Sequence, residues 1–170
     1  MSRDAKHAGL RIGKGIDVHP FCEGRPLVLG GETIPFPRGL AGHSDADVLL
    51  HALSDALLGA AALGDIGLHF PDSDPANRNR SSLEILSLVA RTVEEAGFFV
   101  SNVDTCVLAA EPKISPHYGA MRRNIAHAIG IDDSRVSVKA TTTEGLGFIG
   151  RAEGIAAEAV CLLTPCENSK

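Results

Sequence analysis

Three side chains in the first third of the chain could together bind a catalytic metal ion. Asp17 and His19 stand two residues apart in a run patterned like a strand, so both side chains would point to the same side. His51 lies in an apolar, helix-periodic stretch, where an imidazole costs free energy unless a partner satisfies it. Three nitrogen or oxygen ligands with a fourth position open are typical of catalytic zinc, whereas structural zinc usually has four protein ligands. Hydrogen-bonded structural histidines are the alternative interpretation.

A second polar cluster follows a predicted strand near the C-terminus. Thr141, Thr142 and Thr143 precede Glu144, and three hydroxyls with one carboxylate could hold phosphate oxygens and a divalent cation. The alternative is an ordinary β-branched strand edge. Residues 145–150 match G-x-G-x-x-G, but a dinucleotide site needs a complete βαβ unit, which the rest of the chain does not supply. The threonine cluster is therefore the more informative of the two motifs.

Polar residues at the start of the first predicted helix have two interpretations. Ser44 and Asp47 suit helix capping and the favourable interaction of a carboxylate with the helix N-terminus. His43, one residue before the expected cap, could instead meet an anion. The polar residues of this otherwise apolar helix recur at spacings of three and four and so line one stripe, formed by Asp47, His51, Ser54 and Asp55.

Hydrophobic periodicity and turn residues predict one α+β domain over residues 1–170, with residues 1–9 and 164–170 as flexible tails. Strands are expected at 10–18, 98–109 and 135–140, and a Gly-Gly turn joins a hairpin over 27–34. Helices are expected at 45–63 with Ser44 as N-cap, from a capping box at 81–84 to Gly97, and from 115 to Gly130. Residues 64–80 are expected to form a loop, and the pattern of 153–163 fits either a strand or a helix.

Composition limits the class of protein. The chain has 170 residues, of which 44% are hydrophobic and 22% charged, as expected for a globular domain. It has neither a run of about 18 apolar residues nor an apolar N-terminal segment, so we expect a cytoplasmic protein without a membrane span. A net charge of −5 without a basic run argues against a nucleic-acid partner. Four cysteines without paired spacing are expected to be reduced thiols: Cys22, Cys106, Cys161 and Cys166.

The chain contains several short motifs, which follow one another in a fixed order. They include Gly-Ile-Asp-Val-His at 15–19, the segments 43–51, 60–67, 70–72 and 111–113, and Lys-Ala-Thr-Thr-Thr-Glu at 139–144. With them, residues 10–163 resemble the 2-C-methyl-D-erythritol 2,4-cyclodiphosphate synthase family. The resemblance favours a strand at 153–163 and implies a mainly four-stranded mixed sheet packed against helices. It also implies a homotrimer with each active site between neighbouring subunits.

The resemblance implies a reaction and its cofactors. The expected activity is cyclisation of 4-diphosphocytidyl-2-C-methyl-D-erythritol 2-phosphate to 2-C-methyl-D-erythritol 2,4-cyclodiphosphate, with release of CMP, in non-mevalonate isoprenoid precursor synthesis. The family's zinc ligands fall on Asp17, His19 and His51, in agreement with the choice made from residue types. Glu144 falls on the ligand of a second divalent cation, Mg²⁺ or Mn²⁺.

Further roles follow from the same resemblance. Residues 65–67 would hold the methylerythritol hydroxyls and residues 109–114 the cytidine, while Ile16 would face the trimer axis, where many members carry an aromatic residue. The catalytic positions are His43, Thr142 and Glu144. The substrate-binding positions are His43, Ser44, Asp65, Ile66, Gly67, Phe70, Asp72, Ala109, Pro112, Lys113, Ile114, Thr141, Thr142, Thr143, Phe148 and Arg151.

Two other functions remain open from the residues alone. A zinc phosphohydrolase would use the open metal position to lower the pKa of a water molecule, which would then attack a phosphate. A nucleotide-binding regulatory module would use residues 145–150 without turnover and would need an intact βαβ unit.

Overall fold

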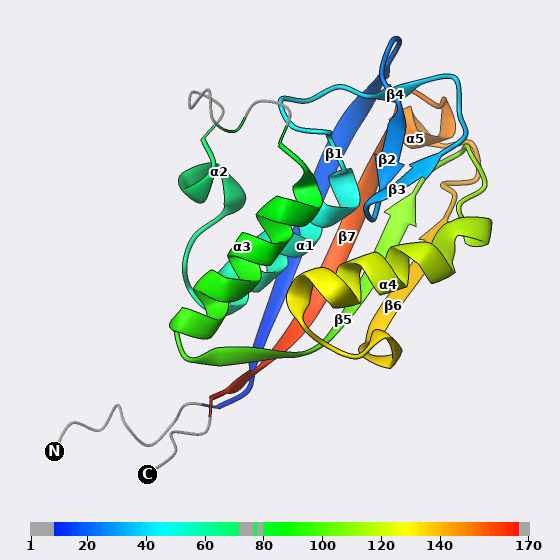
Figure 1. Ribbon diagram of the computed structural model, residues 1–170. Coiled ribbons are helices and arrows are strands. Elements are labelled where there is room, and N and C mark those ends of the chain that lie inside the picture. The colour runs from blue at the N-terminus through cyan, green and yellow to red at the C-terminus, as the bar shows by residue number, and fades with distance from the viewer. Residues whose placement is uncertain (1–8, 72–76, 78–79, 167–170) are drawn as a thin grey trace, which may run out of the picture.

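The central sheet pairs strands that are far apart in the sequence. The computed structural model describes residues 9–71, 77 and 80–166, and its five-stranded sheet has the order β4–β1–β7–β5–β6 (Figure 1). These strands are β1 (Arg11–Cys22), β4 (Gly39–Leu40), β5 (Phe98–Leu108), β6 (Val136–Thr141) and β7 (Gly154–Pro165). β5 and β6 run parallel, and the other neighbouring pairs are antiparallel. The last strand therefore lies between the first strand and β5.

Helices and a short hairpin cover one face of this sheet. The helices α1 (Val48–Ala60), α3 (Ser82–Glu95) and α4 (Tyr118–Ile129) lie in front of the strands in Figure 1. The hairpin of β2 (Leu27–Leu29) and β3 (Glu32–Ile34) lies beside them, and buried leucine, isoleucine and valine side chains of both layers form one core. The remaining single turns are α2 (Ile66–His69), η3 (Ser115–His117), η4 (Asp133–Arg135) and α5 (Gly147–Gly150).

α1 lies close against β1 because both elements present very small residues to each other. Gly13 and Gly15 are buried on the face of β1 that also carries Asp17 and His19. A Cβ atom at either glycine would overlap a backbone carbonyl oxygen of α1. The same close packing holds His51, in the first turns of α1, beside the two polar side chains of β1.

The opposite face of the sheet exposes apolar side chains. Ile12, Ile16, Val18 and Val160 are 75%, 53%, 46% and 40% exposed. Charged residues on this face form two ion pairs, Lys14 with Glu158 and Lys139 with Asp104. An exposed apolar face of this kind is typical of a surface that meets another chain.

The first helix starts later than predicted and has a different N-cap. Asp47, rather than Ser44, caps α1, and its carboxylate accepts an N–H of the first turn together with the N–H of Gly31 at 2.7 Å. Burial raises the pKa of Asp47 to about 6, although these hydrogen bonds act in the opposite direction. Ala46 has a φ of 60°, which a right-handed helix does not allow. Ser44 therefore lies outside the helix, where its hydroxyl contacts His51.

Other predicted boundaries also differ from those of the structure. The expected four-stranded sheet has a fifth strand, β4, whose two residues are too few to show a pattern. β1 continues to Cys22 through pairing with β7 and β4, so the predicted metal ligands lie within the strand and not at its end. α2 lies inside the predicted loop. Residues 154–165 form a strand, as the resemblance favoured, and this strand includes Thr164 and Pro165, which had been assigned to a tail.

The predicted mixed α+β architecture and the helices at α3 and α4 are confirmed. All four cysteines are free, as predicted. Among the described residues, no helix has both the length and the apolar character needed to cross a membrane. The cytoplasmic location stays a prediction.

Candidate metal centre and active site

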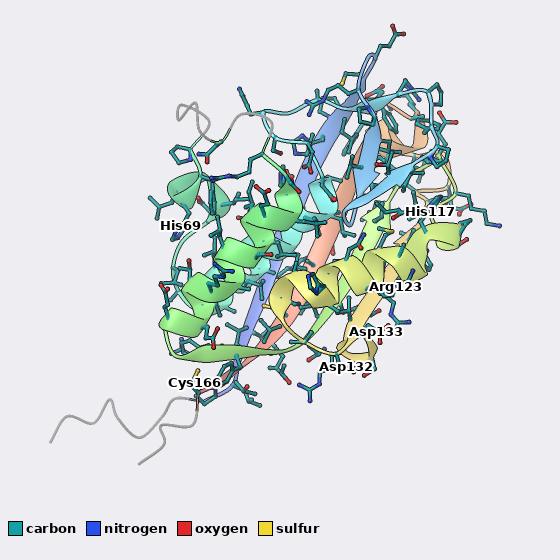
Figure 2. All side chains as sticks on the ribbon, in the orientation of Figure 1. His69, His117, Arg123, Asp132, Asp133 and Cys166 are labelled. Atoms are coloured by element: carbon teal, nitrogen blue, oxygen red, sulfur yellow. The ribbon has the colours of Figure 1, made fainter. Side chains whose placement is uncertain are left out.

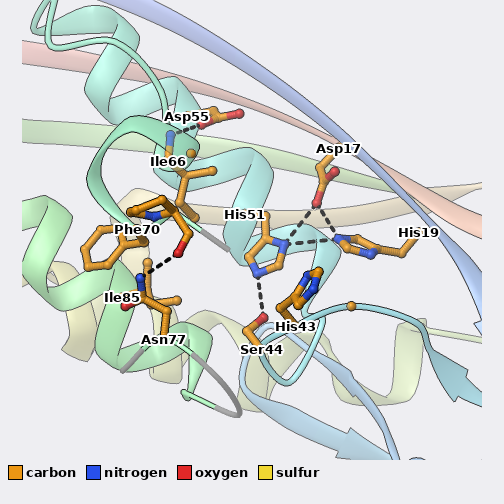
Figure 3. Close-up of a pocket in the computed structure, with 13 residues that line it drawn as sticks. Asp17, His19, His43, Ser44, His51, Asp55, Ile66, Phe70, Asn77 and Ile85 are labelled. Carbon is orange, nitrogen blue, oxygen red and sulfur yellow. Dashed lines mark hydrogen bonds and ion pairs between the residues drawn. The ribbon is translucent and has the colours of Figure 1, made fainter. Parts of the chain in front are cut away.

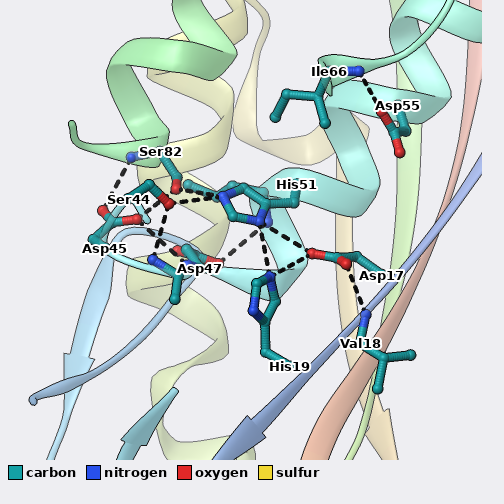
Figure 4. A network of polar contacts seen from close by, with 12 residues as sticks. Asp17, Val18, His19, Ser44, Asp45, Asp47, His51, Asp55, Ile66 and Ser82 are labelled. Atoms are coloured by element: carbon teal, nitrogen blue, oxygen red, sulfur yellow. Dashed lines mark hydrogen bonds and ion pairs between the residues drawn. The ribbon is translucent and has the colours of Figure 1, made fainter. Parts of the chain in front are cut away.

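Asp17, His19 and His51 bring three possible metal ligands to one point (Figure 4). Oδ2 of Asp17 lies 2.9 Å from Nε2 of His19 and 3.1 Å from Nδ1 of His51, and the two nitrogens are 3.1 Å apart. A tetrahedral zinc ion with ligands at about 2.0–2.1 Å places neighbouring ligand atoms roughly 3.3 Å apart. The observed spacings are close to that value, so the three donors fit one zinc ion and fill three of its four positions.

Both histidines have their other ring nitrogen engaged. Nδ1 of His19 lies 2.6 Å from the carbonyl oxygen of Ala41, which can only accept, so this nitrogen is the donor and, in the neutral ring that a metal requires, Nε2 would carry the lone pair. Nε2 of His51 lies 3.0 Å from the hydroxyl of Ser44 and 3.1 Å from that of Ser82. The Ser82 hydroxyl donates its own proton to the carboxylate of Asp45, so it accepts a hydrogen bond from Nε2 of His51. These contacts leave the lone pair of each ring on the side of the triad.

The triad holds an ionised carboxylate. Burial raises the pKa of the Asp17 carboxyl, but hydrogen bonds and the charges of His19 and His51 outweigh this and hold the pKa well below its usual range. Burial lowers the pKa of His19, whereas the hydrogen bond and charge of Asp17 raise it, with a net increase. The side chain of Asp17 is 27% exposed, that of His19 17% and that of His51 14%. An ionised carboxylate in this partly shielded place is suited to hold a divalent ion.

The triad forms part of the wall of a cavity of about 430 Å³ (Figure 3). This volume lies within the range of about 300–1,000 Å³ that is usual for small-molecule sites. Besides the triad, it is lined by five of the predicted substrate-binding residues: His43, Ser44, Ile66, Gly67 and Phe70. The tertiary structure thus gathers residues from β1, α1, α2 and the segment before α1.

Asp55 also lines this cavity, although no role in the site was predicted for it. It lies one helical turn after His51, and its Oδ1 accepts the N–H of Ile66 at 2.8 Å (Figure 3). Burial raises the pKa of Asp55, and the Ile66 N–H partly opposes this increase. Asp55 thereby joins α1 to the start of α2, and the polar stripe on α1 was the signal that could have identified it. Four further lining residues had no such signal: Gly42, Pro71, Asn77 and Ile85.

A second cavity, of about 340 Å³, lies where β5 and β6 end near η3. Six predicted substrate-binding residues line it: Ala109, Pro112, Lys113, Ile114, Thr141 and Thr142. Ala110, which also lines it, falls within the predicted cytidine segment 109–114, and three lining residues were not predicted: Ser115, Tyr118 and Ala140. No residue lines both this cavity and the one beside the triad. The predicted site residues that line these cavities therefore fall into two separate groups.

Five predicted residues line neither of these two cavities: Asp65, Thr143, Glu144, Phe148 and Arg151. The carboxylate of Asp65 accepts the N–H of Leu68 at 2.9 Å and so caps α2. Arg151 forms an ion pair with Glu153 at 2.7 Å. Asp72 lies outside the described residues.

Glu144 is held beside the second cavity by Thr142. Oγ1 of Thr142 donates to Oε1 of Glu144 at 2.8 Å and accepts the Glu144 N–H at 3.2 Å. Because Thr142 itself lines the second cavity, the carboxylate belongs with that group of residues and not with the triad. Both residues are exposed.

The fold and the triad define a class of protein, an α+β domain with an Asp-His-His cluster that could bind a metal ion. The chain belongs to the YgbB family, which it matches over residues 10–164. A protein of Chlorobium phaeobacteroides named 2-C-methyl-D-erythritol 2,4-cyclodiphosphate synthase is 57% identical to it over 154 residues. This match covers 91% of the present chain and 97% of the relative.

Solved structures have the same fold. The bifunctional IspDF of Campylobacter jejuni is 49% identical with a TM-score of 0.89, and the match covers 92% of this chain and 42% of that chain. IspF of Plasmodium falciparum, in complex with CDP, is 34% identical with a TM-score of 0.82, and the match covers 95% of this chain and 100% of that chain. The resemblance inferred from the motifs is confirmed, as is the prediction of an enzyme of the cyclodiphosphate synthase type in isoprenoid synthesis.

The glycine motif has no dinucleotide-binding geometry. Residues 147–150 form only the single turn α5 between β6 and β7. These two strands are not neighbours, because β5 lies between them, and β5 is parallel to β6 but antiparallel to β7. A βαβ unit is therefore absent from this part of the described chain, which removes the basis for the nucleotide-binding module.

Proposed function

We propose that this chain catalyses the metal-dependent cyclisation of 4-diphosphocytidyl-2-C-methyl-D-erythritol 2-phosphate to 2-C-methyl-D-erythritol 2,4-cyclodiphosphate, with release of CMP. The observation that carries the proposal is the triad of Asp17, His19 and His51 at the wall of a cavity, in a chain of the YgbB family. The CDP bound to the similar Plasmodium falciparum protein supports a cytidine nucleotide as part of the substrate.

The reaction requires positioning more than covalent chemistry. An oxygen of the 2-phosphate attacks the β-phosphorus, and the bond from that phosphorus to CMP breaks with its electron pair leaving on CMP. Zinc at the triad and a second divalent cation would supply positive charge that offsets phosphate repulsion and polarises the phosphorus. The side chains then have to hold the nucleophile and the electrophile within reach, an effect worth on the order of 7–11 kcal/mol.

The residues beside the triad would bind the methylerythritol phosphate end of the substrate. His43 and Ser44 would contact the phosphate that attacks, since both line the cavity next to His51. The segment 65–67 would hold the hydroxyl groups, with Phe70 completing that wall. Asp72 stays a predicted substrate contact. Ser44 also keeps its hydroxyl against Nε2 of His51, so substrate binding and metal ligation share one short segment.

The second cavity would receive the nucleotide end. The segment 109–114, with Lys113, would surround the cytidine, and residues 141–143 would donate hydroxyl hydrogen bonds to the phosphates. Phe148 and Arg151 would lie next to this end of the substrate.

A homotrimer would bring the two groups of residues together. One substrate must reach both the triad and the nucleotide wall, which is formed by residues 109–114 and 141–143. No residue lines both cavities within one subunit. Cyclic assembly places the triad of one subunit beside the nucleotide wall of the next. The exposed apolar side chains of Ile12, Ile16 and Val18 on the open sheet face offer a surface for this assembly.

Glu144 would hold the second divalent ion, Mg²⁺ or Mn²⁺. We expect Glu144→Gln to keep its zinc, because the triad is untouched, and to need at least about tenfold more Mg²⁺ for half-maximal rate. The amide oxygen of glutamine can still accept the Thr142 hydroxyl, so the change removes charge more than shape. The measurement is the initial rate as a function of Mg²⁺ concentration. An unchanged Mg²⁺ dependence would assign the second ion to other ligands.

Phosphorus NMR separates cyclisation from hydrolysis. Purified protein with zinc, Mg²⁺ and the diphosphocytidyl substrate should form a cyclic diphosphate and CMP in equal amounts. A zinc phosphohydrolase would instead yield linear phosphates, with oxygen from ¹⁸O-labelled water in the product. Linear products, or no change in the substrate, would refute the proposed reaction.

A further inference from the structure

One short segment contacts both histidines of the triad. In the segment 41–44, which precedes α1, the carbonyl oxygen of Ala41 contacts Nδ1 of His19 at 2.6 Å, and the hydroxyl of Ser44 contacts Nε2 of His51 at 3.0 Å. His43, between them, lines the cavity. The position of this segment therefore affects the orientation of both rings, while Ser82 also contacts Nε2 of His51 at 3.1 Å.

The segment also packs tightly against the His19 ring. A Cβ atom at Gly42 would lie 2.8 Å from the Cβ of Ala46 and 3.2 Å from Cε1 of His19. The backbone at Gly42 thus passes so close to the imidazole that a side chain at this position would crowd the ring. A displacement of the segment by a fraction of an ångström would alter its contacts to the triad.

Arg25 holds this segment from outside the cavity. It lies in the connection between β1 and β2, and its Nη1 donates to the carbonyl oxygen of Gly42 at 2.5 Å, while its Nη2 donates to the carbonyl oxygen of Ser44. These two carbonyls flank His43. The planar guanidinium offers two donors in fixed geometry, whereas a lysine ammonium is a single flexible point charge.

The far end of the segment has a separate attachment. The carboxylate of Asp45 accepts the N–H of Ser82 at 3.0 Å and also the Ser82 hydroxyl, both at the start of α3. Arg25 therefore fixes the two carbonyl groups on either side of His43, while the N–H of Ala41 donates to the carbonyl oxygen of Pro20 at 2.9 Å.

We propose that Arg25 is a positioning residue for the metal centre, which keeps the segment 41–44 in contact with His19 and His51 and so slows loss of the metal ion. This inference rests on the proposed zinc site. It assigns to Arg25 no contact with the substrate, and it concerns the retention of zinc before any substrate binds.

The test measures zinc release to a chromogenic chelator from the full-length, zinc-loaded protein without substrate. We expect Arg25→Ala to release zinc roughly tenfold or more faster than the parent protein, as is usual when partners that orient metal ligands are lost. Arg25→Lys keeps the positive charge but loses the two donors in fixed geometry, so it should also release zinc faster than the parent protein. Guanidinium chloride, added to Arg25→Ala below denaturing concentrations, should slow the release again.

Arg122 provides a matched control. Its guanidinium also donates two hydrogen bonds to a backbone carbonyl, that of Asp133, with Nε at 3.3 Å and Nη2 at 2.9 Å. Figure 2 shows Asp133 at the turn that follows α4, whereas the triad belongs to β1 and α1. Arg122→Ala should release zinc at the parent rate.

The outcomes separate this inference from the proposed function. If Arg25→Ala and Arg25→Lys both release zinc at the parent rate, Arg25 does not position the metal centre, whatever the enzyme's product. If guanidinium fails to slow release from Arg25→Ala, the effect of the substitution comes from general loosening of the fold and the inference is also wrong. If the parent protein itself holds no zinc, the proposed metal site fails and the inference fails with it.

Discussion

His51→Ala is expected to lose its zinc and nearly all turnover while the fold survives. The change removes one of three protein ligands, and the remaining Asp17 and His19 should bind zinc far more weakly. Without the metal charge, several kcal/mol of transition-state stabilisation are lost, so we expect turnover to fall on the order of a thousandfold. Zinc content by elemental analysis, circular dichroism and the initial rate are the three measurements.

His127→Ala is the matched control for this prediction. His127 lies on α4, in a different part of the structure from the triad, so its replacement should leave zinc content and turnover unchanged. Full zinc occupancy in purified His51→Ala protein would contradict the metal assignment. A variant that retains zinc but loses turnover would place His51 in substrate binding instead.

Mixed trimers of two inactive variants are expected to regain activity. His51→Ala disables the triad, whereas Lys113→Ala disables the nucleotide wall, which lies in the other cavity. If each site joins the triad of one subunit to the nucleotide wall of the next, every mixed trimer contains one site in which both walls are intact. Mixed trimers purified through two different affinity tags should therefore show about one third of the parental rate.

This experiment requires that each variant alone forms trimers and is inactive. Tagged trimers in which all three subunits carry the same variant provide the background rate. Mixed trimers no more active than that background would mean that each site lies wholly within one subunit. The two cavities would then have to bind the substrate by a rearrangement within a single chain.

The sequence predicted the triad because the relevant properties are local. Alternation along a strand is enough to place Asp17 and His19 on one face, and β1 has this alternation. His51 was conspicuous as an imidazole in an apolar helix. The same polar stripe contains Asp55, which lines the cavity, so this signal was present in the sequence although no role in the site was inferred from it.

Boundaries that depend on distant contacts were predicted less well. Ser44 looked like an N-cap, yet the carboxylate of Asp47 takes that position because it also accepts the N–H of Gly31 in the hairpin. In the sheet, the last strand β7 pairs with both β1 and β5. Neither contact leaves a trace in the local pattern, because each joins residues far apart in the chain.

The sequence by itself determined the ligand types, most helices and strands, and membership of the family, since motifs and periodicity are carried by neighbouring residues. Only the tertiary structure decided that the segment 41–44 contacts both histidines, that Arg25 fastens it, and that the predicted site residues lie in two cavities. The physical reason is that these features arise where packing brings β1, α1 and their connections together. The close approach of α1 to the glycines of β1 sets the distance between His51 and the side chains of Asp17 and His19. No local run of residues encodes this approach.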